Sequence, residues 1–238
     1  MAPLTPGSAE TLGGRGLCYR HLLMPGILFA AAVLFLNGLH MDLRLTDAIF
    51  TWEGGTWMRH YWLFDGVIHS GGRLLVGIMV IVLIGTLLGS FVIPNLRLYR
   101  KGLIYLFTVI LCALVLINML KAISGIPCPW SVARYGGSEP FRDVWSGFSF
   151  ERGCFPAGHA SGGYVWVALY FFARVYFPRM RYWALAVGLG LGLVFGLGQQ
   201  FRGAHFLSHD IWTLTICWYV SLFGYLRFFR GNPSSPPL

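Results

Sequence analysis

Long apolar stretches separated by short polar segments run through the whole chain of 238 residues. Each stretch has 16 to 20 residues, and a helix of that length is about as long as the ~30 Å hydrocarbon core of a bilayer is thick. The pattern therefore predicts an all-α fold, an integral membrane six-helix bundle formed by one domain, residues 1–238. The predicted membrane-spanning helices are Leu22–Leu39, Leu74–Ile93, Gly102–Leu120, Ala160–Phe177, Trp183–Gly198 and Ile211–Phe229.

Two of the connecting segments are too long to be simple turns. His40–Arg73 has an amphipathic run followed by several tryptophans and tyrosines, which predicts an outward-facing helix on the membrane surface with aromatic rings at headgroup depth. Ser124–Gly158 is rich in Gly, Pro and Arg, which favours a lid or a headgroup-binding loop. Glycines at every fourth position from Gly188 to Gly196 allow a neighbouring helix to approach closely. The proline-rich tail 231–238 is expected to be disordered.

Composition and charge agree with a membrane protein and also give an orientation. The chain is 56% hydrophobic and only 11% charged, which excludes an ordinary soluble domain. With six spans, one side of the membrane carries ten basic residues and one acid, 10 − 1 = +9, which is the whole formal net charge; the other side carries eight of each sign. The positive-inside rule then predicts that both termini are cytoplasmic and that the long segments face outward.

The sequence predicts neither a cleaved signal peptide nor a nucleic-acid partner. The start of the chain does not show the order of regions typical of a cleaved signal peptide, so we interpret the first helix as a retained anchor. The basic residues lie in short loops and form no continuous patch, so nucleic acid is not a predicted partner. The sequence does not indicate an oligomeric state.

Titratable residues recur at one face of the predicted bundle. Lys121 ends the third span, His159 begins the fourth, and His205 lies between the fifth and sixth. Counting the membrane crossings places all three on the outward side, although 38 and 46 residues separate them in sequence. Any one of them alone would be an ordinary residue at a helix end, but their convergence indicates an active site.

The residue types in this group suit a phosphate group. One imidazole can attack phosphorus while another protonates the leaving oxygen. The segment Pro156-Ala-Gly-His159 begins a helix, where backbone N–H groups such as that of Gly158 attract an anion. Lys121 adds a point charge, and Arg202 offers a planar fork of donors. These features predict a membrane-embedded phosphatase.

The same three segments resemble the type-2 phosphatidic-acid phosphatase superfamily of membrane lipid phosphatases, in a divergent bacterial branch. Its pattern has Lys, six residues and Arg-Pro, then Pro-Ser-Gly-His, then Ser-Arg, five residues, His, three residues and Asp. Lys121 and Pro129 fit the first motif, Pro156, Gly158 and His159 the second, and His205 the third. The resemblance implies that His205 is the nucleophile and forms a phosphohistidine, and that His159 is the general acid. The bacterial branch implies a location in the bacterial inner (plasma) membrane, with the active site facing the periplasm.

The chain departs from the family pattern at several positions. Ala157 replaces a serine, and Cys128 and Gln199 occupy the places of two phosphate-binding arginines. We expect Arg202, with Arg134 or Arg142, to take over their roles.

Two residues compete to orient the ring of His205. His209 stands at the family's carboxylate position, and the carboxylate of Asp210 follows one residue later. We expect Asp210→Asn to reduce activity more than His209→Ala, because a carboxylate stabilises a cationic imidazole better. The spacing of His205, His209 and Asp210 is also compatible with a metal site, but the nearby Lys121 disfavours a cation, so no metal is predicted.

Two of the five cysteines, Cys128 and Cys154, lie in the predicted periplasmic loop beside the first two motifs. An oxidising compartment would permit a disulfide between them. The alternative is that they are two small buried thiols.

The sequence thus predicts a phosphatase acting on a phosphorylated membrane lipid, without a cofactor. Lipid A-type phosphates, polyprenyl (pyro)phosphates and phosphatidylglycerol phosphate all remain open as substrates. A lipid phosphotransferase is a close alternative, because only the acceptor changes. A non-catalytic lipid-phosphate binding or transport protein is another, and Cys128, Ala157 and Gln199 favour it.

Overall fold

The computed structural model describes residues 14–229. The tail 231–238, interpreted above as disordered, lies outside the described residues. Within residues 14–229 the structure is all-helical, and the only β feature there is an isolated bridge between Val132 and Glu139. The main helices are α1 (Gly14–Cys18), α2 (Met24–Gly38), α3 (Met41–Trp52), α4 (Gly72–Val92), α5 (Arg100–Ile123), α6 (Gly158–Tyr164), α7 (Ala168–Tyr176), α8 (Arg181–Phe201) and α9 (Leu207–Phe229).

Shorter helical segments connect or extend these helices. Two π-helices, η1 (Tyr19–Leu23) and η2 (Leu63–Gly71), lead directly into α2 and α4. The others are 3₁₀ turns: η3 (Pro94–Tyr99), η4 (Pro129–Ser131), η5 (Ala133–Tyr135), η6 (Val144–Ser146), η7 (Val165–Val167) and η8 (Pro178–Met180).

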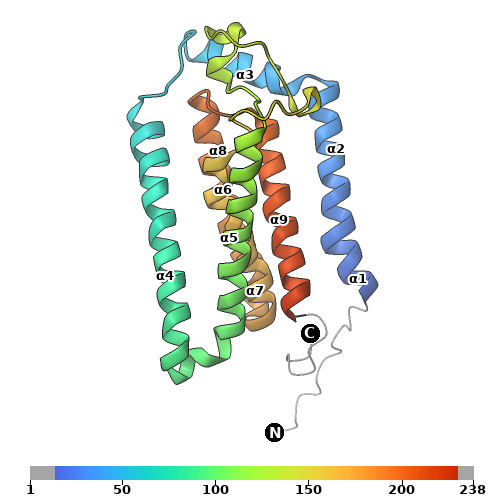
Figure 1. The fold of residues 1–238 in the computed structure, drawn as a ribbon, viewed down its shortest axis with the longest axis vertical. Helices are drawn as coiled ribbons and strands as arrows, with labels where there is room; N and C mark the ends of the chain where they lie inside the picture. Colours follow the sequence, from blue (N-terminus) through green and yellow to red (C-terminus); the bar gives the residue numbers. More distant parts are fainter. Residues whose placement is uncertain (1–13, 230–238) are drawn as a thin grey trace.

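The long helices lie side by side along the long axis of the molecule (Figure 1). Helix α3 crosses one end of this bundle, which we call the α3 end, while α1 and the last turn of α9 lie at the opposite end. Within residues 14–229, four helical stretches are long and apolar enough to cross a membrane: Gly16–Gly38, Leu63–Val92, Pro94–Ile123 and Pro178–Phe201. The chain is therefore a membrane protein.

The second of these stretches begins earlier than the hydropathy pattern predicts. The predicted span starts at Leu74, but the helix already starts at Leu63 and continues through η2 into α4. Asp65, Gly66 and Ser70 lower the hydropathy of this part of the chain, although they do not interrupt its helical hydrogen bonding. The extension brings His69 onto the helix.

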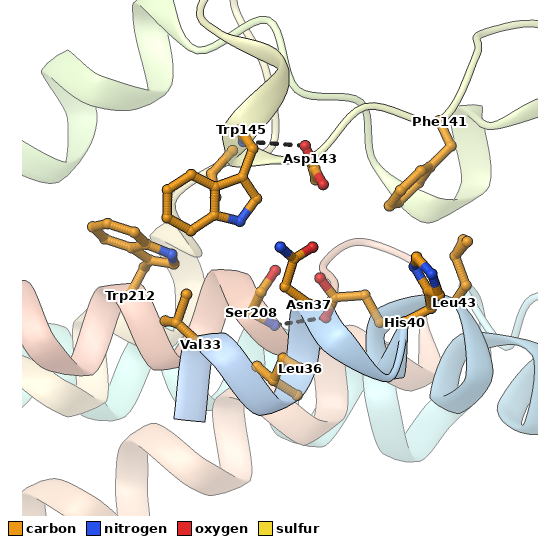
Figure 2. Close-up of a pocket in the computed structure, with 12 residues that line it drawn as sticks. Val33, Leu36, Asn37, His40, Leu43, Phe141, Asp143, Trp145, Ser208 and Trp212 are labelled. Atoms are coloured by element: carbon orange, nitrogen blue, oxygen red, sulfur yellow. Dashed lines mark hydrogen bonds between the residues drawn. The ribbon is translucent and has the colours of Figure 1, made fainter. Parts of the chain in front are cut away.

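The α3 end is closed by α3 and by the loop between α5 and α6. Asp42 of α3 accepts a hydrogen bond of 2.9 Å from the backbone N–H of Ser208, in the first turn of α9. A pocket lies beside this bond, between α2, α3, the loop and α9 (Figure 2). Asp42 and Asp143 both line it, and two carboxylates disfavour a phosphate. Desolvation raises the pKa of Asp42, and the hydrogen bond from Ser208 lowers it in part.

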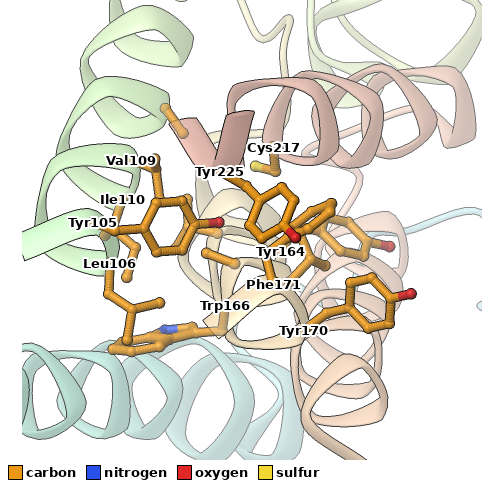
Figure 3. Close-up of a cluster of buried hydrophobic side chains, with 14 of the residues drawn as sticks. Tyr105, Leu106, Val109, Ile110, Tyr164, Trp166, Tyr170, Phe171, Cys217 and Tyr225 are labelled. Atoms are coloured by element: carbon orange, nitrogen blue, oxygen red, sulfur yellow. The ribbon is translucent and has the colours of Figure 1, made fainter. Parts of the chain in front are cut away.

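The buried core lies where α5, α6, α7 and α9 meet, and aromatic rings dominate it (Figure 3). Tyr105 of α5 donates a hydrogen bond of 3.0 Å to the backbone carbonyl of Ser221 in α9. The backbone of α8 lies in close contact with those of α6 and η7: a β-carbon at Gly163 of α6 would overlap the main chain of α8, and one at Gly188 of α8 would overlap that of η7. This close packing holds the start of α6 against the end of α8, where the candidate site lies.

Candidate active site

Four predicted site residues lie at the α3 end of the bundle, each at the end or start of a helix. Lys121 is in the last turn of α5, and His159 is the second residue of α6. His205 lies in the turn between α8 and α9, and His209 in the first turn of α9. The structure therefore brings together the residues that the crossing count placed on one face.

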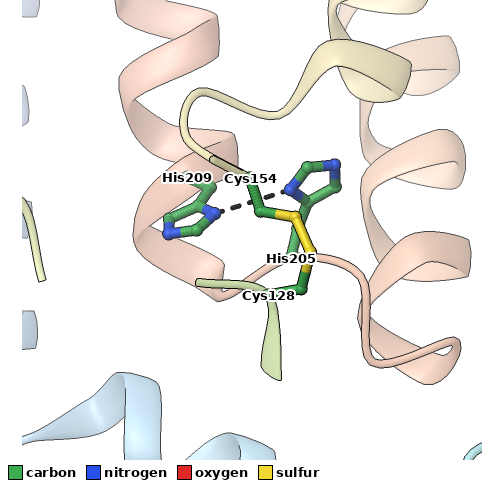
Figure 4. The surroundings of a disulfide bond; sticks show 4 residues. All are labelled: Cys128, Cys154, His205 and His209. Atoms are coloured by element: carbon green, nitrogen blue, oxygen red, sulfur yellow. Dashed lines mark hydrogen bonds between the residues drawn. A yellow bond between two sulfur atoms is a disulfide. The ribbon is translucent and has the colours of Figure 1, made fainter. Parts of the chain in front are cut away.

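His205 is buried beside His209 (Figure 4). Only 4% of His205 is exposed, and its Nδ1 lies 3.5 Å from Nδ1 of His209. Burial lowers the pKa of His205 well below its ordinary value, and the charges of Lys121 and His209 lower it further. His205 is therefore neutral at physiological pH, and its ring keeps the lone pair that a nucleophile needs.

The carboxylate of Asp210 points to a different partner. Its Oδ2 accepts a hydrogen bond of 2.7 Å from Nε2 of Gln200 in α8, and Gly196 lies against it, because a β-carbon at Gly196 would be 2.7 Å from the same oxygen. One residue along a helix is a rotation of about 100°, and the first turn of α9 keeps this angle. The geometry thus favours His209 as the neighbour of His205, against the expectation that Asp210 is the more important.

The start of α6 is fixed to α9 and covers Lys121. The backbone N–H of Ala157 donates to Oγ1 of Thr213 at 2.9 Å, and that hydroxyl donates to the carbonyl of His209 at 2.7 Å. Nζ of Lys121 would be 3.6 Å from a β-carbon at Gly158. Lys121, Gly158 and the two histidine segments therefore form one cluster.

Arg202 is positioned by three groups from different parts of the chain. Its Nη2 donates to Asp65 at 2.8 Å, its Nε to the carbonyl of Arg59 at 3.2 Å, and its Nη1 to Oε1 of Gln199 at 3.4 Å. Only 13% of the Arg202 side chain is exposed. The guanidinium that we expected to replace the arginine missing at Gln199 thus stands next to that position.

The other two arginines proposed for phosphate have different surroundings. Arg134 is exposed and makes two hydrogen bonds, of 2.7 and 2.6 Å, to the carboxylate of Asp47 in α3. Its guanidinium thus pairs with α3, whereas Arg202 is bonded to Gln199 at the site. Arg142 is half-buried, and its Nε has no hydrogen-bond partner among the described residues.

A disulfide between Cys128 and Cys154 lies beside the two histidines (Figure 4). Their Cα atoms are 5.1 Å apart. The backbone around the bond is also paired: Cys154 N–H donates to the carbonyl of Ile126 at 2.7 Å, and Gly153 N–H to that of Lys121 at 3.0 Å. The segments that follow α5 and precede α6 are thus joined directly over the site.

The sequence interpretation missed His69, Asp65 and Gln200. The ring of His69 stands 4.6 Å from that of His159, centroid to centroid. Asp65 and Gln200 hold Arg202 and Asp210, as described. The signal for His69 and Asp65 was their four-residue spacing within Leu63–Gly71, which is part of the segment interpreted as an outward-facing helix on the membrane surface. No three His, Cys, Asp or Glu side chains within residues 14–229 are grouped so that they could hold a metal ion.

Comparison with known proteins agrees with this geometry. A search of curated proteins and a search of solved structures each returned no match. The family model of the PAP2 superfamily matches residues 101–233, more than half of the chain, including Lys121, His159 and His205. The chain therefore belongs to the PAP2 superfamily of membrane phosphatases.

Proposed function

We propose that this protein hydrolyses a phosphorylated membrane lipid at the periplasmic face of a bacterial inner membrane. The observation that carries the proposal is a group of basic side chains in which His205 and His209 are buried and Lys121 and His159 are partly buried. Two acids of the adjoining helices, Asp210 and Asp65, are hydrogen-bonded to Gln200 and Arg202, respectively. A group of this kind attracts an anion, and the family indicates that the anion is a phosphate.

The proposed topology has six spans, with α6–α7 and α9 in addition to the four apolar stretches. Both of these spans contribute to the buried core of the bundle, where the other helices shield their polar residues from lipid. Helix α3 would lie on the membrane surface, with both termini cytoplasmic. A reporter fused after Leu238 should then read as cytoplasmic and one inserted near Gly137 as periplasmic, and the reverse readings would reject this orientation.

The proposed reaction has two steps. Nε2 of His205 attacks phosphorus, and the bond to the lipid oxygen breaks as His159, in its protonated imidazolium form, donates a proton to that oxygen and becomes neutral. His159 then accepts a proton from a water molecule, whose oxygen attacks the phosphohistidine and releases phosphate with a neutral His205. Lys121, Arg202 and the N–H of Gly158 hold the phosphoryl oxygens during both displacements. Because these groups supply the positive charge, the scheme uses no cofactor.

Phosphate release from a panel of lipid phosphates tests this function. The panel holds a lipid A-type phosphate, a polyprenyl pyrophosphate, a polyprenyl phosphate and phosphatidylglycerol phosphate, each with wild-type protein and His205→Ala in detergent. Release by wild type and none by His205→Ala supports the enzyme and names the headgroup. Transfer of phosphate to a second lipid would indicate a phosphotransferase. Binding without turnover on every substrate would support a binding or transport protein, which the replacements at Ala157, Cys128 and Gln199 favour.

A further inference from the structure

Within residues 14–229, His69 is the one polar side chain that packs ring against ring on the proposed proton donor. The two imidazoles of His69 and His159 meet edge to face, with centroids 4.6 Å apart and an angle of 89° between the ring planes. His69 comes from η2, at the start of the helix that continues into α4, whereas His159 begins α6. The contact therefore joins two segments that are 90 residues apart in sequence.

Close packing against α8 fixes the position of His69. A β-carbon at Gly198 would be 2.6 Å from Cγ2 of Ile68, and one at Gly72 would be 2.7 Å from Cε1 of Phe195. The residues on both sides of His69 thus contact α8 with no spare room. Phe195 also packs on the ring of His159, with centroids 5.4 Å apart. The two imidazoles are held in one rigid setting.

Each ring of this pair presents a nitrogen that has no partner. Nδ1 of His69 and Nε2 of His159 are buried, and neither forms a hydrogen bond to any described residue. A buried polar atom without a partner is costly, so native proteins normally satisfy it. The guanidinium groups of Arg73 and Arg202 lie within electrostatic reach of both rings, and the carboxylate of Asp65, which is paired with Arg202, lies within reach of His69. An oxygen of an anionic group is therefore the ligand that suits this place.

We propose that His69 is a further substrate-binding residue of this site: with the proton on Nδ1, it donates a hydrogen bond to a phosphoryl oxygen beside the leaving oxygen that His159 serves. This inference rests on the proposed function, because it assigns a second imidazole to the same phosphate group. His69 has no counterpart in the three motifs described above. It supplies, from η2, a donor at a site where Cys128 stands in place of a phosphate-binding arginine and is held in a disulfide.

Three substitutions separate hydrogen bonding from packing. His69→Phe keeps a ring against His159 but has no N–H, His69→Gln keeps a donor but no ring, and His69→Ala has neither. If His69 donates to the phosphoryl group, His69→Phe and His69→Ala should both lower kcat/KM for a lipid phosphate by about 10²-fold, as for other preorganised donors at a reacting group. His69→Gln should recover part of this loss. His60→Ala, at an exposed histidine of the adjoining loop, is the matched control and should behave as wild type.

The same variants are measured for binding of orthovanadate, which imitates a phosphoryl group and needs no turnover. The inference predicts that His69→Phe weakens this binding about 10-fold or more, while the midpoint of thermal unfolding changes little. If His69→Phe retains both wild-type activity and vanadate binding and His69→Gln loses them, the ring of His69 only packs and the inference is wrong. If wild type releases no phosphate from any lipid, the proposed function fails, and vanadate binding alone still decides the role of His69.

Discussion

Substituting each of the two candidate partners of His205 in turn gives the sharpest structural prediction. His209 has its Nδ1 at 3.5 Å from Nδ1 of His205, while Asp210 is bonded to Gln200. We therefore expect His209→Ala to reduce kcat and Asp210→Asn to reduce stability. This reverses the order expected from the sequence, in which the carboxylate was the stronger partner.

The size of each effect follows from the contacts. A hydrogen bond between neutral groups contributes about 0.5–1.5 kcal/mol, or roughly 2- to 13-fold in rate, and the ring of His205 also gains freedom to turn. We expect His209→Ala to lower kcat about 10- to 100-fold, less than the ~10⁴-fold typical of an orienting carboxylate. Asp210→Asn keeps the shape but weakens the bond from Gln200, which costs up to about 1.5–3 kcal/mol of stability if the carboxylate is charged.

The assay is initial-rate phosphate release on the best lipid of the panel, with thermal unfolding in detergent measured on the same samples. We expect kcat of Asp210→Asn to stay within about threefold of wild type, with a lower unfolding midpoint. A loss of 100-fold or more in Asp210→Asn at an unchanged midpoint, with near-normal His209→Ala, would refute the assignment of His209 as the partner.

Three further predictions concern stability. Replacing Cys128 and Cys154 with serine opens a loop with a sequence separation of 26, and loop closure gives an upper limit of about 3.5 kcal/mol for the stability that is lost. The unfolding midpoint should therefore fall, and mild reduction of wild type should reproduce the fall. An unchanged midpoint would show that the helices alone hold the loop. Gly196→Ala places a β-carbon 2.7 Å from Oδ2 of Asp210 and should lower stability by about 1–3 kcal/mol. Gly190→Ala is the control, because a β-carbon there meets no atom within 4 Å and stability should not change. Equal effects of the two substitutions would contradict the packing of Asp210 against Gly196. The pKa of His205 is lowered on folding, so below about pH 6.5 the unfolded chain binds a proton that the folded chain does not. Thermal scans should therefore show that stability decreases as the pH is lowered through that range, and that it decreases less steeply in His205→Asn than in wild type. Equal slopes in the two proteins would contradict the lowered pKa.

Much of the site could be predicted because helix direction follows from the hydrophobic pattern alone. Once apolar stretches alternate across a bilayer, Lys121, His159 and His205 must lie at the same end, and the structure arranges the helices in that way. The cysteine pair could be considered for a similar reason, since both residues flank these motifs in one loop.

Contacts between distant side chains could not be predicted. Arg202 with Asp65 and Arg134 with Asp47 are pairs separated by 137 and 87 residues, and no local pattern connects them. His69 was missed because polar residues lower the hydropathy of Leu63–Gly71 while its helical hydrogen bonds persist. Whether the Asp210 side chain points toward His205 depends on whether the first turn of α9 is regular, and the sequence of that turn does not reveal this.

The most direct test of the central claim is to trap the covalent intermediate on His205. A lipid phosphate labelled in the phosphoryl group is mixed with protein and quenched in alkali, because a phosphohistidine is stable in base and labile in acid. The proposed mechanism predicts alkali-stable, acid-labile label on the peptide that contains His205, and none in His205→Ala. Turnover of the same lipid by wild type with label on another residue, or with undiminished activity in His205→Ala, would contradict it.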